Sequence, residues 1–255
     1  MDIPILYEDE SVVVIDKPSG VICNRAETVM TETIQDWMDI RYQMQDLRFK
    51  NVDEDTRYFQ ERSGLVHRLD KETSGVMVLA KTPEAFIELL RQFREREVVK
   101  TYVALTHGIW KSKDGTISLP IGRRRDDRQK FGVREDGRES VTGYKVLSEW
   151  VSWKFPKELH VDDRGYSGFS LVQFMPKTGR THQIRVHARF VGHPVVGDMQ
   201  YAGRKRSRED RKWSKHVMLL ARSIEFTRPA PRGERVHFET KQDLLREAGE
   251  YFPRG

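Results

Sequence analysis

Short apolar runs alternate along the chain with amphipathic and charged segments, so strands and helices are both expected. Several runs have the length and the β-branched or aromatic content of strands. They cover residues 3–7, 12–15, 75–80, 98–105, 141–147, 169–175, 217–220, 224–226 and 236–238. The pattern predicts a fold built from many short strands.

The clearest helical pattern follows Thr82-Pro83. Phe86, Leu89, Leu90 and Phe93 recur at i, i+3, i+4 and i+7, with charged residues between them. Thr82 suits the N-cap, and Pro83 suits the first helical position. Weaker patterns predict helices over 31–47, 180–192 and 242–251. Two charged stretches, 50–62 and 122–138, are expected to be loops.

Composition narrows the class of protein. The chain has 255 residues and 33% charged residues, with a net charge of +6 that favours a polyanionic partner. Its single cysteine, Cys23, excludes an intramolecular disulfide and suits a reducing compartment. The sequence has no signal-peptide pattern and no apolar window of about 18 residues. We therefore expect a cytoplasmic protein without a membrane span.

One polar segment stands out as a candidate for chemistry. It is GLVHRLDKETSG, residues 64–75, which lies between two apolar runs. Loops at strand ends commonly carry active-site residues. Composition alone also allows an ordinary solvated turn, so the order of residues has to decide.

That order resembles the HRLD-x-x-TSG signature of the RluA-type pseudouridine synthases. Four more segments resemble elements of that family and follow in its order. They are ILYEDESVVVIDKPSGV, VVKTYVALTHG, PKTGRTHQIRVHARFVGHPVVGD and HVMLLARSIEF, and together with HRLDKETSG they span residues from about 4 to about 227. Several motifs in register are far more specific than one motif.

The resemblance implies an α+β fold, with a mixed, mainly antiparallel central sheet, flanking helices and a central active-site cleft. It also implies an RNA pseudouridine synthase, which isomerises uridines in structured RNA, ribosomal or transfer RNA, after flipping the base out. We expect one catalytic domain over residues 1–255, no N-terminal S4-type RNA-binding domain, and a monomer.

Three catalytic residues follow from the resemblance. Asp70 stands where the family has its nucleophile, and a carboxylate can form a covalent intermediate with the nucleoside. Attack at C1′ of the ribose and attack at C6 of the base both stay open. Arg185 matches the arginine that pairs with the aspartate, and Tyr102 matches the tyrosine at the base, as a stacking surface or a proton relay.

Further residues are candidates for contact with the substrate. Arg68 matches the arginine that takes the place of the everted base, although a structural salt bridge would also explain it. The remaining candidates for RNA binding or for bracing the loops are His67, Arg180, His182 and Gln183. The spacing of the histidines does not suit a metal, and no nucleotide-cofactor motif is present, so no metal or cofactor is expected.

Two basic segments are candidate RNA contacts. Residues 122–138 contain seven basic and four acidic residues, and residues 204–215 contain seven basic and two acidic residues beside Trp213. A solvated loop is the alternative for each. Two other functions also remain possible at this point, a catalytically silent RNA-binding or ribosome-assembly module and a hydrolase that uses Asp70.

Overall fold

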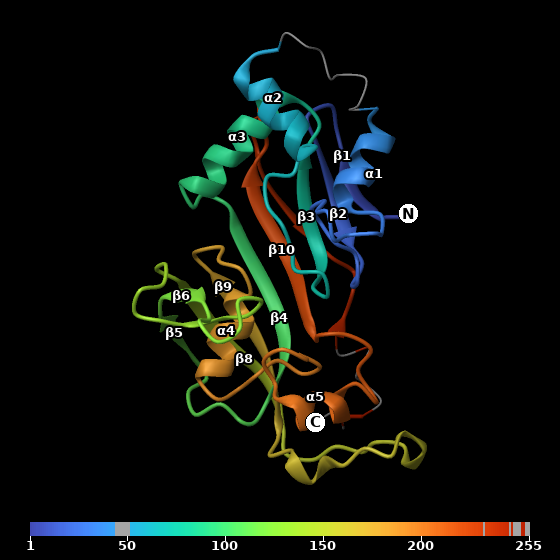
Figure 1. Cartoon of the computed structure of the whole chain (residues 1–255), viewed down its shortest axis with the longest axis vertical. Coiled ribbons are helices and arrows are strands. Elements are labelled where there is room, and N and C mark those ends of the chain that lie inside the picture. The colour runs from blue at the N-terminus through green and yellow to red at the C-terminus, as the bar shows by residue number, and fades with distance from the viewer. Residues whose placement is uncertain (44–51, 232, 245, 247–250, 253–255) are drawn as a thin grey trace. The chain divides into compact units, whose positions relative to one another are not determined.

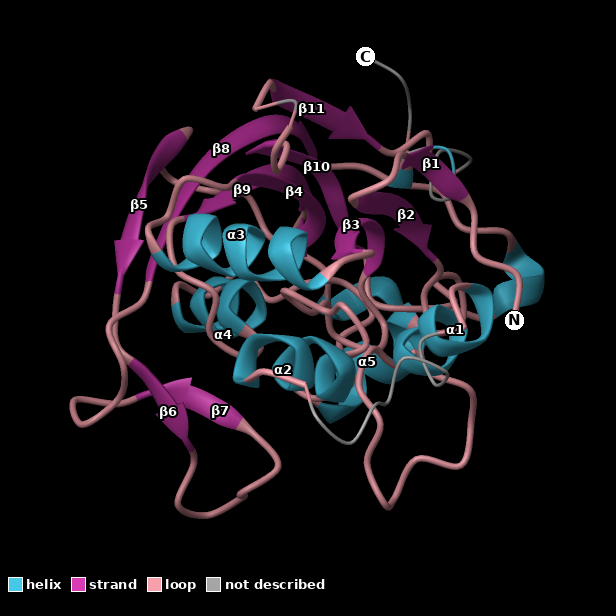
Figure 2. Cartoon of the chain, turned by 90° about the horizontal axis from the view of Figure 1, so that it is seen from above, coloured by secondary structure: helices cyan, strands magenta, loops and turns pink. Residues whose placement is uncertain are grey.

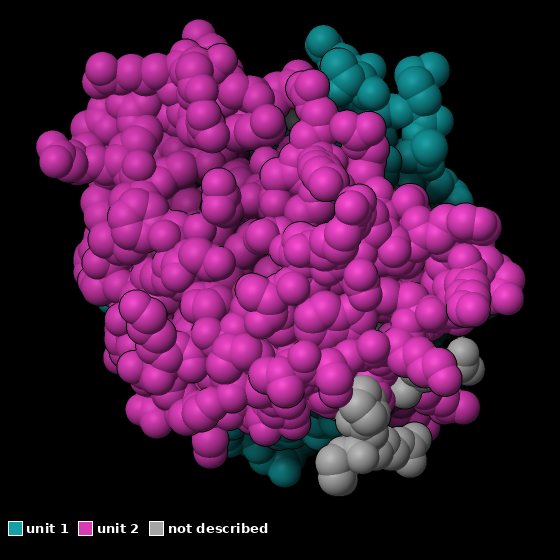
Figure 3. Space-filling model, turned by 90° about the horizontal axis from the view of Figure 1, so that it is seen from below, with its two compact units in different colours: residues 1–100, 221–240 teal, residues 101–220, 241–255 magenta. Residues whose placement is uncertain are grey.

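The computed structural model describes residues 1–43, 52–231, 233–244, 246 and 251–252. The chain divides into two compact units, shown in different colours in Figure 3. Unit 1 comprises residues 1–100 and 221–240, and unit 2 comprises residues 101–220 and 241–255. The assignment of a single catalytic domain over 1–255 stays a prediction.

Unit 1 is built on strands β1 (Ile5–Glu8), β2 (Val12–Lys17), β3 (Ser74–Ala80), β11 (Arg235–Glu239) and most of β10 (Leu219–Thr227). The strands are ordered β1-β2-β3-β10, and β11 pairs with β10. The β1–β2, β2–β3 and β10–β11 pairs are antiparallel. Every residue of β2 and β3 is buried, which explains the continuous apolar runs 12–15 and 75–80 within them.

Among the described residues of unit 1 lie the helices α1 (Ile34–Arg41), α2 (Glu54–Arg62) and α3 (Pro83–Arg94). Figure 2 shows α2 and α3 side by side on one face of the strands, where α3 contacts β3. The expected cap of α3 is confirmed, because the Thr82 hydroxyl accepts the backbone N–H of Ala85 at 3.3 Å. The helix expected over 31–47 is shorter, since Thr33 caps it and Tyr42 ends it; residues 44–47 lie outside the described part of the chain.

The expected loop over 50–62 is wrong in its second half, where α2 forms. Asp53 caps α2 by accepting the backbone N–H of Thr56 at 2.9 Å. Phe59 is the only buried residue of this helix, and its ring meets Phe86 of α3 edge-on. Tyr58 of the same helix also meets the Phe86 ring edge-on, and these few contacts are a pattern too sparse for periodicity to detect.

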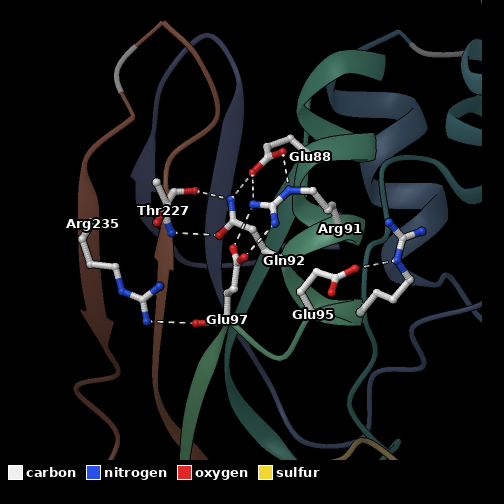
Figure 4. Close-up of polar contacts among 8 residues, drawn as sticks. Glu88, Arg91, Gln92, Glu95, Glu97, Thr227 and Arg235 are labelled. Atoms are coloured by element: carbon white, nitrogen blue, oxygen red, sulfur yellow. Dashed lines mark hydrogen bonds and ion pairs between the residues drawn. The ribbon is translucent and has the colours of Figure 1, made fainter.

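A buried glutamine joins α3 to β10 (Figure 4). The Gln92 amide donates to the Thr227 carbonyl at 2.7 Å and accepts the Thr227 N–H at 2.9 Å. Glu88 accepts a further bond from the same amide, and Arg91 bridges Glu88 and Glu97. The Gln92 side chain thus bonds both the backbone N–H and the backbone carbonyl of Thr227, the last residue of β10.

Unit 2 holds strands β4 (Val99–His107, from Thr101 onward), β9 (Phe169–Pro176), β8 (Val141–Trp150) and β5 (Asp114–Ser118), in that order. The three pairs are antiparallel. Between β8 and β9 the long loop 151–168 contains two short 3-10 turns, Lys157–Leu159 and Asp163–Gly165 (yellow in Figure 1). Helices α4 (Gln183–Phe190) and α5 (Arg204–Asp210) also belong to this unit.

The basic segment 122–138 is not simply a loop. Strands β6 (Ile121–Arg123) and β7 (Phe131–Val133) pair as a separate two-stranded sheet, and β7 contacts α4. Ile121, Phe131 and Val133 supply apolar contacts, but their spacing within a charged segment hides the strands from a pattern search.

Two further expectations near the C-terminus need correction or lie outside the described residues. The separate strands expected at 217–220 and 224–226 are one strand, β10, which passes through Arg222 and Ser223 because Ser223 pairs with Glu239 of β11. Half of the helix expected over 242–251 lies outside the described residues, and of its described residues Leu244 and Arg246 are helical. Within the described residues, no helix has the length and apolar character to cross a membrane.

Candidate active site

Asp70 lies at the start of a tight turn in unit 1. The Thr73 N–H donates to the Asp70 carbonyl at 3.1 Å, so residues 70–73 form a β-turn that leads into β3. The chain before the turn runs back along β3, where the Gly64 carbonyl accepts the Ala80 N–H at 2.9 Å. The Asp70 side chain is half-buried. The HRLD segment is therefore anchored to a fully buried strand.

The segment 17–23 holds the carbonyl groups of this turn. Gly20 N–H and the Lys17 ammonium donate to the Lys71 carbonyl at 2.8 and 3.2 Å. The Ser19 hydroxyl donates to the Glu72 carbonyl at 2.7 Å, and the Cys23 thiol donates to the Leu69 carbonyl at 3.3 Å. Two motifs about 50 residues apart thus form one site in unit 1.

Lys17 is fully buried, and the sequence analysis did not identify it. Its ammonium also donates to the carbonyls of Pro18 and Val21, both at 2.9 Å. Burial lowers the pKa of Lys17 to about 8, although the charges of Cys23 and Asp70 oppose this shift. The available signal was the apolar run Val12–Ile15 in the same strand, which indicates a strand buried on both faces.

His67 and Arg68 differ in their surroundings. The His67 ring stacks on Phe93 with centroids 4.7 Å apart, and its Nε2 accepts the Val78 N–H at 3.2 Å. Burial, aided by the charge of Lys100, lowers the pKa of His67 to about 3, so the ring is neutral. Arg68 is exposed. His67 therefore braces the segment before Asp70, while the Arg68 side chain remains accessible.

The neutral His67 leads to a prediction about pH. Histidine in the unfolded chain titrates near pH 6.5, so below that pH the unfolded state binds a proton that the folded state does not. The free energy of unfolding should fall as pH is lowered from 6.5 toward 3, by up to about 2 kcal/mol from this residue at pH 5. Urea unfolding at pH 7.5 and pH 5.0 measures the loss.

His67→Gln is the informative variant, since an amide oxygen can still accept the Val78 N–H but does not titrate. It should lose less stability than the wild type between the two pH values. His160→Gln, at an exposed position, should behave as the wild type does. The same pH dependence for wild type and His67→Gln would contradict this reading of His67.

Tyr102 and Arg185 lie in unit 2. Tyr102 is half-buried on β4, opposite Phe174 of β9, and packs on a buried cluster that includes Ile184 and Ala188 of α4. Arg185 comes from the same helix and is buried. Asp198 binds its Nε at 2.7 Å and its Nη2 at 2.9 Å, and Gln200 accepts a further bond at 3.0 Å.

Asp198 is a second residue that the sequence analysis did not identify. Its carboxylate holds the guanidinium with two parallel hydrogen bonds, the geometry that best orients an arginine. The sequence signal was the aspartate that ends GHPVVGD, because a buried arginine such as Arg185 requires an acidic residue nearby. The expected pairing of Arg185 with Asp70 involves residues of different units and stays a prediction.

Gln183 shapes the entrance to α4. Its Oε1 accepts the Thr178 hydroxyl at 2.7 Å and the Arg180 N–H at 3.0 Å, and its Nε2 donates to the Val141 carbonyl and the Thr142 hydroxyl. These bonds use all four hydrogen-bonding positions of the amide. Arg180 donates from Nε to the Glu139 carbonyl at 3.1 Å. Gln183 therefore braces the loop before α4 and presents no spare amide position to RNA.

The histidines considered for a metal have protein partners. His182 Nδ1 bonds the Tyr201 hydroxyl at 2.8 Å. His187 is buried with both nitrogens bonded, to the Thr142 hydroxyl and the Leu119 carbonyl, and His193 Nδ1 bonds the His107 carbonyl. Trp213, the aromatic residue of the second basic segment, is buried against Phe155 and Phe252, so the expectation that its ring stacks on RNA is wrong.

Comparison with known proteins decides the family. The model of a family described as RNA pseudouridylate synthase matches residues 11–190. The chain belongs to this family. Among its relatives, an uncharacterized RNA pseudouridine synthase of Aquifex aeolicus is 36% identical over 243 residues, covering 94% of this chain and 69% of that protein. The ribosomal large subunit pseudouridine synthase D of Pseudomonas aeruginosa is 38% identical, covering 81% of this chain and 55% of that protein.

Solved structures agree with the family. Human RNA pseudouridylate synthase domain containing 1 matches with a TM-score of 0.72 and 27% identity, covering 99% of this chain and 89% of that one. The expected mixed, mainly antiparallel sheet with flanking helices is confirmed by this likeness. The chain spans 55% to 69% of the length of the two curated relatives above.

Proposed function

We propose that this pseudouridine synthase isomerises uridine to pseudouridine in structured RNA, and that its substrate is ribosomal RNA. The anchored turn of Asp70 carries the proposal. Segment 17–23 binds the carbonyls of residues 69, 71 and 72, so the nucleophile is presented from a rigid backbone. The names of two relatives, ribosomal large subunit pseudouridine synthases D and C, support the choice of RNA.

In the proposed reaction the Asp70 carboxylate forms a covalent bond with the nucleoside, and the bond between C1′ and N1 breaks. The uracil rotates, C5 joins C1′, Asp70 is released, C5 loses its proton and N1 gains one. Attack at C1′ and attack at C6 lead to the same product. Arg185 would serve as the charge partner of Asp70, Tyr102 would contact the base, and the exposed Arg68 would aid eversion.

The β6–β7 hairpin is the proposed contact with the RNA backbone. A hollow of about 600 Å³ on this hairpin is lined by Arg124, Arg125 and Arg134, with Asp126, Glu135 and Asp136 beside them. Segment 122–138 carries seven basic and four acidic residues. Arginine binds phosphate oxygens well, and this contribution should weaken as salt rises.

The experiment uses total RNA labelled with tritium at uridine C5, isolated from cells that lack this gene. We expect the protein to release tritium and to form pseudouridine, detected by mass spectrometry of nucleosides. Fractionation of the RNA should place the product in ribosomal RNA. Free uracil would instead indicate a hydrolase, and RNA binding without either product would indicate a silent binding module.

A further inference from the structure

Tyr201 of unit 2 lies where the β6–β7 hairpin meets α4. It is buried and forms a small apolar cluster with Ile121 of β6 and Val186 of α4, against which Phe131 and Val133 of β7 pack. The hairpin strands have three residues each and pair only with one another among the named strands. This cluster therefore determines how the hairpin sits on α4.

The Tyr201 hydroxyl forms two bonds within this cluster. It accepts the backbone N–H of Phe131 at 3.1 Å, and it lies 2.8 Å from His182 Nδ1. A hydroxyl has one proton and two lone pairs, so it can accept the Phe131 N–H and at the same time bond His182 Nδ1 in either direction, according to the tautomer of the ring. The hydroxyl thus links the hairpin to the residue that precedes α4.

The ring of Tyr201 faces the active-site arginine. The Arg185 guanidinium lies 5.0 Å from the ring centroid, within range of a cation–π contact. Asp198, which holds Arg185, also accepts the backbone N–H groups of Gln200 and Tyr201 at 3.0 and 3.1 Å. One short turn therefore presents both the carboxylate and the ring to the same guanidinium.

We propose that Tyr201 is a positioning residue that couples the β6–β7 hairpin to Arg185, so that RNA held by the hairpin is set in register with the arginine. This rests on the proposed function for the roles of Arg185 and the hairpin. The hydroxyl and the ring of Tyr201 have separate roles. The hydroxyl holds the hairpin through its hydrogen bond with Phe131 N–H, which we call the tether, and the ring packs on Arg185. A tyrosine that merely filled the core would show no such separation.

Tyr201→Phe removes the tether and keeps the ring. Hydrogen exchange of the hairpin amides, measured without RNA, should be at least about fivefold faster in segment 121–133, while exchange in β3 stays unchanged. With the tritium-labelled RNA, the half-saturating concentration should rise about tenfold, the size expected for one lost buried hydrogen bond. The maximal rate should stay within about twofold, since Asp198 still holds Arg185.

Tyr201→Leu also removes the ring, and its maximal rate should fall at least about fivefold in addition. Tyr144→Phe is the matched control, because it removes a hydroxyl from β8 of the same unit, outside this cluster; it should match the wild type in every readout. Melting curves of all variants confirm that each is folded at the assay temperature.

Unchanged exchange of the hairpin in Tyr201→Phe would overturn the tether. Faster exchange with an unchanged half-saturating concentration would overturn its role in placing RNA, as would equal kinetic effects of Tyr201→Phe and Tyr201→Leu. The exchange measurement needs no substrate. It therefore tests the tether even if the wild type releases no tritium, a result that counts against the proposed function.

Discussion

Asp70→Asn is expected to abolish tritium release from uridine-labelled RNA, with a fall in rate of at least about 10⁴-fold. The amide has the shape of the carboxylate but cannot form the covalent intermediate. Asparagine also suits the first position of a β-turn, so the bond from Thr73 N–H to the residue 70 carbonyl should survive. RNA binding, measured by filter retention, should stay within about threefold of the wild type.

Glu72→Gln is the matched control for this substitution. It neutralises a half-buried carboxylate two residues further along the same turn, and it should keep the rate within about tenfold of the wild type. Equal tritium release by the wild type and Asp70→Asn would remove Asp70 from the mechanism. A large loss in both variants would show that the charge of the turn matters, and not the nucleophile at residue 70.

The Asp70 turn could be predicted from the sequence because its residues are local. HRLDKETSG supplies a polar turn and the glycine that lets two backbones meet, and the apolar run of β3 follows it directly. Gly75 has φ +110°, and a Cβ there would lie 2.2 Å from the Ala221 carbonyl oxygen on β10. Such a position tolerates only glycine, so the glycine that ends HRLDKETSG has a direct steric cause.

The features that the sequence did not reveal depend on contacts between distant residues. α2 forms because Phe59 packs on α3, and β10 continues through Arg222 and Ser223 because β11 pairs with it. Neither segment carries enough local apolar pattern to predict the element. Tertiary packing determined both.

The same reason explains the missed polar residues of the site. Lysine and aspartate are normally exposed, so Lys17 and Asp198 would be assigned to the surface by residue type. Lys17 is buried because the carbonyls of residues 18, 21 and 71 surround its ammonium, and Asp198 is buried because Arg185 lies beside it. Buried charges require such partners, which only the folded chain supplies.

Lys17→Met is expected to lower the free energy of unfolding by about 3 to 5 kcal/mol, because it leaves three carbonyls without the buried donor they now share. For a chain of this size that loss corresponds to a melting temperature lower by roughly 10 °C. Lys71→Met makes the same exchange at an exposed lysine of the Asp70 turn, and it should change stability by less than about 0.5 kcal/mol. Chemical unfolding of the two variants and the wild type measures the three free energies of unfolding to be compared. Methionine fills much of the volume of lysine, so a large difference in stability between the two variants would come from the lost hydrogen bonds. Equal small effects in both variants would mean that the buried ammonium does not stabilise the segment that holds Asp70.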